Sequence, residues 1–380
     1  MIPDSFDDIR PYRDPEIPAA MERIASNPTF RLISDFLFPE RRVEDVRKDL
    51  AGVRTTHDFQ HIFMKPAIGS IVEKTTGGVT FDGLDTLPAD GRYLFISNHR
   101  DIALDAAILT WAMACRDIET PEITFGANLM QGQFVIDFGK SNKMFRVERP
   151  STASSVKEFL LGSRRLSEYI RETITVRRQS VWIAQRNGRT KDGNDTTDQG
   201  LVKMLGMSLP DDKVEALASL NIVPMSISYE WEPCDILKVL ELYETSRRAY
   251  IKKPGEDLAS IIQGIIQPKG RIHISLCNPI GRDELLSLDH LVNSRYNREV
   301  ASLIDHRIRG AYRMWPNNYI AHDIRFGRHS YAHLYTKEEK AAFEDHLSEL
   351  SKYDSYDVEQ LRDILLSIYA TPVDNAPSTI

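Results

Sequence analysis

Cysteine is scarce in this sequence. Only Cys115, Cys234 and Cys277 occur among its 380 residues, and they are widely separated. An odd number of scattered cysteines disfavours a disulfide framework, and no C-x-x-C pair is present to bind a metal. We therefore expect reduced thiols, a cytoplasmic compartment and no bound metal ion.

Long apolar runs are also absent. The stretch from Ala107 to Cys115 is well below the roughly 18 to 20 residues that a membrane-spanning helix needs. The opening MIPDSFDDIRPYRD is acidic and lacks both the basic part and the apolar part of a secretory signal. The sequence therefore predicts neither a transmembrane helix nor a leader that is removed.

Two common functional motifs are missing as well. No G-x-x-x-x-G-K-[ST] occurs, which excludes the usual P-loop, and no G-x-S-x-G occurs, which disfavours a serine hydrolase. The formal net charge of -7 argues against general nucleic-acid binding. Positive charge is nevertheless concentrated between Arg146 and Lys191, where Lys and Arg clearly outnumber Glu, so this region can favour anions.

The middle of the chain alternates between strand and helix patterns, and an apolar content of 42% is enough for a sizeable core. The runs expected as strands are Gly78 to Phe81, Tyr93 to Ser97, Ile123 to Gly126, Ser180 to Ala184, Ile222 to Tyr229 and Arg271 to Cys277. Helices are expected at residues 101–115, 155–175, 200–207, 236–248 and 257–266. This alternation predicts an α/β fold: a mostly parallel mixed sheet flanked by helices.

Helical patterns occupy both flanks of this region. The first 75 residues include an amphipathic candidate from Phe59 to Val72, with a kink expected at Pro66. Beyond residue 284 lie three helical stretches, and Thr336 and Asp357 are suitable caps for the second and third. The predicted regions are a helical N-terminal region (1–75), an α/β domain (76–284) and a helical C-terminal region (285–380).

The segment YLFISNHRDIALDAAIL places His99 between an apolar strand and a helix. Because open α/β sheets bind ligands at the carboxyl ends of their strands, His99 is expected at an exposed, rigid corner. Imidazole is a suitable general base near neutral pH, and it needs a second group to fix its tautomer. Asp105 is our preferred partner, and Asp101 is the alternative, although it also suits the N-cap of the helix.

An isolated histidine near an aspartate is often merely structural, but three further segments accompany this one. SNHRDIALD resembles the first block, N-H-x(4)-D, of the glycerolipid acyltransferase family of the PlsC type. MFRVERP (residues 144–150) is similar to the second block, VWIAQRNGRTKDG (181–193) to the third, F-P-E-G-T-R-S, and IVPMSISYE (222–230) to the fourth. Four blocks in the family's order are far more specific than one, and NHRDIxLD with AQRxGRxKDG is typical of a bacterial branch.

The sequence departs from the family pattern at three places. Five residues instead of four separate His99 from Asp105, Asn187 stands where the family has Glu, and Arg189 comes one place early.

By this resemblance Arg149 holds the phosphate of the acceptor, and Arg146 and Arg189 are further anion-binding candidates. A planar guanidinium suits this role because it can bind an oxyanion through two parallel hydrogen bonds. The alternative for Arg146 is a surface ion pair with Glu148 or Glu172.

The third block implies a second role. Gly188 allows the backbone to approach the reacting centre, where N–H groups can stabilise the oxyanion of a tetrahedral intermediate. Asn187 and Arg186 flank this glycine and are included in the predicted site. The alternative is an ordinary glycine turn with solvated basic neighbours.

The resemblance implies an enzyme of phospholipid biosynthesis that needs no cofactor. It would move a fatty acyl group from acyl-CoA or acyl carrier protein to the hydroxyl of a precursor such as 1-acylglycerol-3-phosphate. Two alternatives are a lyso-lipid acceptor built on an amino acid, and a non-catalytic module that binds lipid or acyl carrier protein. The expected location is peripheral, on the cytoplasmic side of the inner membrane. Phe59 to Val72 would contact that membrane, or would instead pack on the α/β domain.

Overall fold

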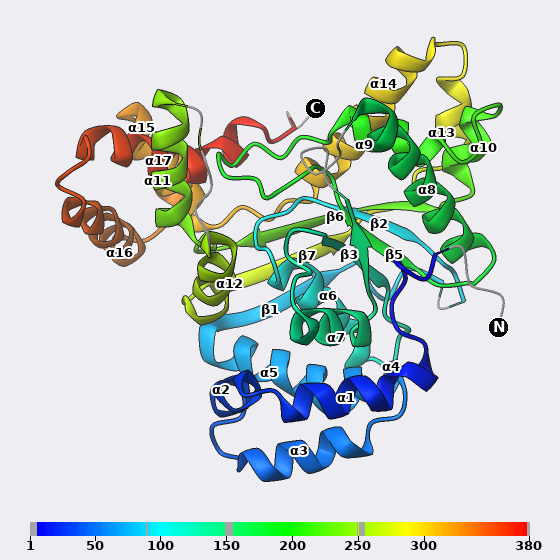
Figure 1. Ribbon diagram of the computed structural model, residues 1–380. Helices are drawn as coiled ribbons and strands as arrows, with labels where there is room; N and C mark the ends of the chain where they lie inside the picture. The colour runs from blue at the N-terminus through cyan, green and yellow to red at the C-terminus, as the bar shows by residue number, and fades with distance from the viewer. Residues whose placement is uncertain (1–5, 89, 149–154, 249, 251–254, 378–380) are drawn as a thin grey trace.

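The centre of the protein is a seven-stranded sheet in the order β1-β7-β6-β2-β5-β3-β4 (Figure 1). The structure is a computed structural model and describes residues 6–88, 90–148, 155–248, 250 and 255–377. The strands are β1 (Thr76–Asp82), β2 (Leu94–Ser97), β3 (Glu122–Gly126), β4 (Met144–Val147), β5 (Val181–Ala184), β6 (Ile222–Tyr229) and β7 (Gly270–Leu276). All neighbouring strands are parallel except β6 and β7, which are antiparallel. The predicted α/β fold with a mostly parallel mixed sheet is confirmed.

One face of the sheet packs against the N-terminal half of the chain. Phe95, Trp182 and Val223 point to this face and share one core with apolar residues of the covering helices. In Figure 1 these helices lie below the sheet. They are α1 (Ile17–Ser26), α2 (Thr29–Leu37), α3 (Val43–Gly52), α4 (Thr56–Asp58), α5 (Lys65–Thr75), α6 (Leu104–Ala114) and α7 (Gln133–Ser141), joined at one side by α12 (Glu256–Ile266).

The opposite face has a separate core. Because side chains alternate along a strand, Leu94 and Ile96 point away from Phe95 and into this second core. The helices that cover it are α8 (Val156–Thr175), α9 (Gln199–Gly206), α10 (Lys213–Ala218), α13 (Arg282–Ser287) and α14 (Asn293–Gly310). With both faces covered, the central strands are buried almost throughout, which explains why their sequences are apolar runs.

A third core joins the end of the chain to the middle. It is formed by α11 (Asp235–Arg247), α15 (Pro316–Phe326), α16 (Lys337–Ser348) and α17 (Val358–Asp374). Thr336 and Asp357 cap α16 and α17, as the sequence predicts. The strand β4 and the helices α3, α4, α7, α10, α13 and α15 were not predicted as separate elements, and most of them are short.

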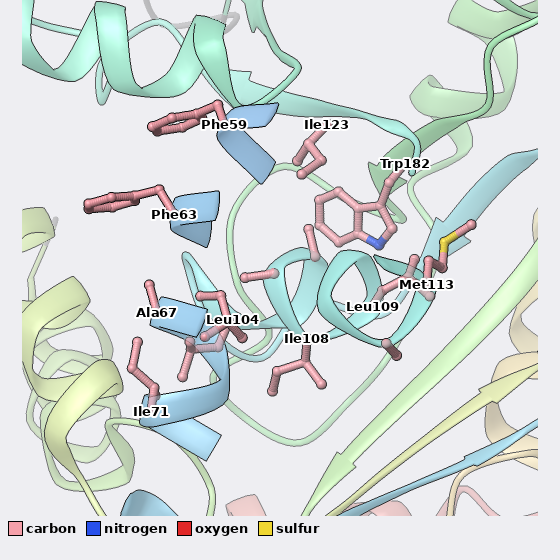
Figure 2. Packing of buried hydrophobic residues seen from close by; sticks show 14 of the residues in the cluster. Phe59, Phe63, Ala67, Ile71, Leu104, Ile108, Leu109, Met113, Ile123 and Trp182 are labelled. Atoms are coloured by element: carbon pink, nitrogen blue, oxygen red, sulfur yellow. The ribbon is translucent and has the colours of Figure 1, made fainter. Parts of the chain in front are cut away.

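Most apolar side chains of the segment from Phe59 to Val72 are buried, although Ile62 is 40% exposed. It begins as a π-helix, Phe59–Met64, and continues as α5, with Pro66 in the first turn of the α-helix. Phe59, Phe63 and Ile71 are buried in the core below the sheet (Figure 2), and the rings of Phe59 and Phe63 both contact that of Phe138 on α7. Of the two alternatives considered from the sequence, packing on the α/β domain is what the structure shows for these buried side chains, and contact with a membrane stays a prediction.

Across the described ranges, no helix combines the length and the apolar character that crossing a bilayer requires.

Replacing Phe63 with Ala should lower the free energy of unfolding by about 3–5 kcal/mol. The Phe63 ring fills a packed aromatic cluster, and its removal leaves a cavity there. Chemical denaturation in aqueous buffer measures this. The control is Leu32→Ala, whose side chain is 72% exposed and whose removal should cost no more than about 0.5 kcal/mol. Equal stability of the two variants would contradict the burial of this segment.

Candidate active site

The turn after β2 is fixed by the side chain of Asn98. Its amide donates to the carbonyl of Ile227 at 3.0 Å and its Oδ1 accepts from the N–H of Ile227 at 2.8 Å, so it extends the pairing of β2 with β6 by one step. The next residue, His99, consequently starts from a rigid strand end. Its side chain is 14% exposed, which keeps one edge of the ring accessible.

Asp105, in the first turn of α6, binds the ring of His99. Its Oδ2 lies 2.8 Å from Nδ1 of His99 and also accepts the backbone N–H groups of Arg100 and Asp101 at 2.6 and 3.0 Å. A carboxylate among several donors acts as the acceptor, so Nδ1 carries the proton and Nε2 keeps its lone pair. The geometry required of a general base is present at this corner.

Tyr229 completes the surroundings of Asp105 and was not found from the sequence. Its hydroxyl donates to Oδ1 of Asp105 at 2.7 Å, and both side chains are buried. Burial and the nearby Asp105 carboxylate raise the pKa of Tyr229 well above its usual value, so the phenol remains a donor. The alternation of Met225, Ile227 and Tyr229 along β6 was the available signal, because it places all three side chains on the face of His99.

Trp182 forms a wall beside the histidine. Its ring lies edge-on to the ring of His99, with 5.9 Å between the centroids. Trp182 comes from β5, which is paired with β2, so two neighbouring strands shape one side of the site.

Asp101 has a different role from Asp105. Its Oδ1 accepts the N–H groups of Ala103 and Leu104 at 2.9 and 2.8 Å and thereby caps the start of α6. Its Oδ2 packs against Gly264 of α12. A Cβ atom on residue 264 would lie only 2.1 Å from this oxygen. Burial and the neighbouring Asp105 raise the pKa of Asp101. Of the two candidate partners, Asp105 contacts the His99 ring and Asp101 supports the helix.

The loop after β5 lies directly against this corner. The N–H of Thr190 donates to the carbonyl oxygen of His99 at 2.7 Å. Gly188 has a positive φ of 77°, a conformation that suits glycine, and Asn187 beside it is exposed. Arg186 and Arg189 are half-buried. The structure thus brings the predicted third block next to the first.

The predicted second block is less complete. Arg149 lies outside the described residues. Arg146 is on the edge strand β4, is about half exposed, and pairs with Glu148 at 2.7 Å, which is the alternative considered from the sequence. Arg146 is therefore engaged in an ion pair three strands away from His99.

The acidic loop at Asp192, Asn194 and Asp195 is engaged in protein contacts. Asp195 pairs with Arg100 at 2.6 Å, and Asn194 accepts from Asn375 at 3.0 Å. Within the ranges that the structure describes, no group of three or more His, Cys, Asp or Glu side chains is placed to hold a metal ion.

Comparison with known proteins gives a family match and similar solved structures. Residues 78–228 match the family model Acyltransferase, a range that includes His99, Asp105 and Gly188. No curated protein matches the sequence. One similar solved structure is the 1-acyl-sn-glycerophosphate acyltransferase PlsC from Thermotoga maritima, which is 12% identical to this chain. The match covers 76% of this chain and 92% of that chain, with a TM-score of 0.35. The segment that builds the His99 corner is therefore similar to the acyltransferase family, and this match supports an enzyme.

Proposed function

We propose that the protein moves a fatty acyl group from the thioester of acyl-CoA or acyl carrier protein to the hydroxyl of a lysophospholipid precursor such as 1-acylglycerol-3-phosphate. The observation that carries this proposal is the pairing of His99 with Asp105 at the end of β2, inside the segment matched by the acyltransferase family. Both members of the pair sit in the block SNHRDIALD, which resembles that of the glycerolipid branch.

The chemistry follows from the free Nε2 atom. Nε2 of His99 takes the proton of the acceptor hydroxyl while the oxygen attacks the carbonyl carbon of the thioester. Asp105 holds the ring in the required tautomer and stabilises the positive charge that forms on it. The tetrahedral intermediate then collapses, the carbon–sulfur bond breaks, and the proton passes from His99 to the leaving thiolate. The products are an acylated lipid and a free thiol.

The loop from Arg186 to Thr190 supplies the electrostatic part of the proposal. It contacts the backbone of His99, so its N–H groups and guanidinium groups are near the developing negative charge. Arg189 directly precedes Thr190, which makes that contact, and we assign Arg189 to the anionic part of the substrates together with Arg149. These positive groups favour an acceptor that carries a phosphate.

The acceptor is a lipid in this proposal, so the enzyme acts at a membrane surface. We place it peripherally, on the cytoplasmic side of the inner membrane.

The direct test is an assay of thiol release from acyl-CoA and from acyl carrier protein. Purified protein should release thiol only when a lyso-lipid is added, and chromatography should show the matching diacyl product. His99→Ala should lower kcat by at least about 10³-fold. An amino-acid-based lyso-lipid is offered in parallel, and its exclusive use would replace the phosphate acceptor in the proposal. Full activity of His99→Ala would refute the mechanism.

Asp105→Asn and Asp101→Asn separate the two carboxylates by function. Asp105→Asn should lower kcat by about 10³- to 10⁴-fold, because an amide can present its N–H to His99 and favour the wrong tautomer. Asp101→Asn is its matched control: both side chains are fully buried, and the retained oxygen can still cap α6, so kcat should fall less than about tenfold. Steady-state kinetics decides this, and the reverse order of effects would assign the partner role to Asp101.

A further inference from the structure

The two residues that flank His99 in the sequence bind the same atom. Oδ2 of Asp195 accepts a hydrogen bond from Nδ2 of Asn98 at 2.9 Å and another from Nη2 of Arg100 at 2.6 Å. Asp195 belongs to the loop between β5 and α9, which also carries Gly188. A single carboxylate oxygen of this loop therefore fixes the chain on both sides of His99.

Arg100 is the centre of a buried, charge-balanced cluster. Its side chain is only 1% exposed, and its Nη1 lies 3.3 Å from Oε2 of Glu232. Lys238 on α11 donates to Oε1 of Glu232 at 2.6 Å and to the backbone oxygen of Arg100 at 2.8 Å. The guanidinium also lies 5.3 Å from the ring centre of Tyr312. The two cations are balanced by two carboxylates, those of Asp195 and Glu232.

Such a cluster is better explained by the positions in which it holds its partners than by a contribution to the stability of the fold. Burying charges costs so much solvation that apolar residues of the same volume often stabilise a fold equally well. A guanidinium fork instead fixes the direction of each partner, because its N–H groups point in set directions in one plane. Here it sets the position of the Asp195 loop relative to the end of β2.

We propose that Arg100 and Asp195 are positioning residues for acyl transfer, which hold the loop of Gly188 and Arg189 in register with Nε2 of His99. The inference rests on the proposed function, because the transfer step is what requires both segments in one arrangement. The Thr190 N–H bond to the backbone oxygen of His99, at 2.7 Å, is a second link between the same segments. We call the two hydrogen bonds from Asn98 and Arg100 to Asp195 the clamp. Without the clamp the ring of His99 still binds Asp105, but the loop is no longer held in a fixed position.

Asp195→Asn tests the clamp because it keeps the shape of the side chain and removes its charge. We expect kcat to fall about 100-fold, the scale of a small misplacement, with the KM for the acyl thioester within about threefold of the wild-type value. The matched control is Asp137→Asn on α7, an equally buried carboxylate that binds Arg23 at 2.7 and 2.8 Å. It should lose thermal stability to a similar extent and keep kcat.

Hydrogen–deuterium exchange without substrate gives a readout that does not depend on activity. In Asp195→Asn, amides of residues 186–198, Thr190 above all, should exchange faster than in the wild type, and in Asp137→Asn they should not. If Asp195→Asn does not fold, Arg100→Lys replaces it, because a lysine keeps the charge but not the fork. It should show the same faster exchange and the same loss of kcat.

A variant with wild-type kcat and unchanged protection at Thr190 would overturn the clamp. Absence of lipid acyl transfer in the wild-type enzyme would instead refute the proposed function, and the exchange data would still decide whether the clamp exists.

Discussion

The carboxylate of Asp105 is the constraint on which the rest of the site depends. It is buried, and four donors surround it: the ring of His99, the N–H groups of Arg100 and Asp101, and the hydroxyl of Tyr229. A buried carboxylate without donors would be costly, so the strand ends and the first turn of α6 have to meet at this point. The orientation of His99 is a consequence of that meeting.

The order of the strands explains how distant segments reach one place. β2 lies between β5 and β6 and is parallel to both, so the carboxyl ends of these three strands share one edge of the sheet. The first brings His99, the second the loop of Gly188 and Asp195, and the third Tyr229. Helices on both faces bury the strands and keep this edge rigid, while α11 and α17 support it through Glu232, whose N–H binds the hydroxyl of Tyr369.

Sequence patterns predicted most of the sheet because its central strands are buried on both faces and read as apolar runs. The strand β4 was missed because MFRV at the edge of the sheet is too short and mixed to be recognised. Helices α7 and α15 were missed as well. The segment from Phe59 to Val72 was recognised as amphipathic, but amphipathicity alone does not say whether an apolar face meets a membrane or a core. The neighbouring Phe30, Phe38 and Phe138 rings decide that here.

By itself, the sequence was enough to predict the α/β class, the resemblance to acyltransferases and His99 as the candidate base, because these predictions follow from local periodicity and from ordered blocks of residues. Only the tertiary structure decided that Asp105 and not Asp101 binds the ring, and that Tyr229 and Asp195 belong to the same corner. Asp101 and Asp105 both lie close to His99 in the chain, so only the folded turn decides which of them reaches the ring. Tyr229 and Asp195 are joined to this corner by hydrogen bonds between groups more than 90 positions apart, which no local pattern encodes.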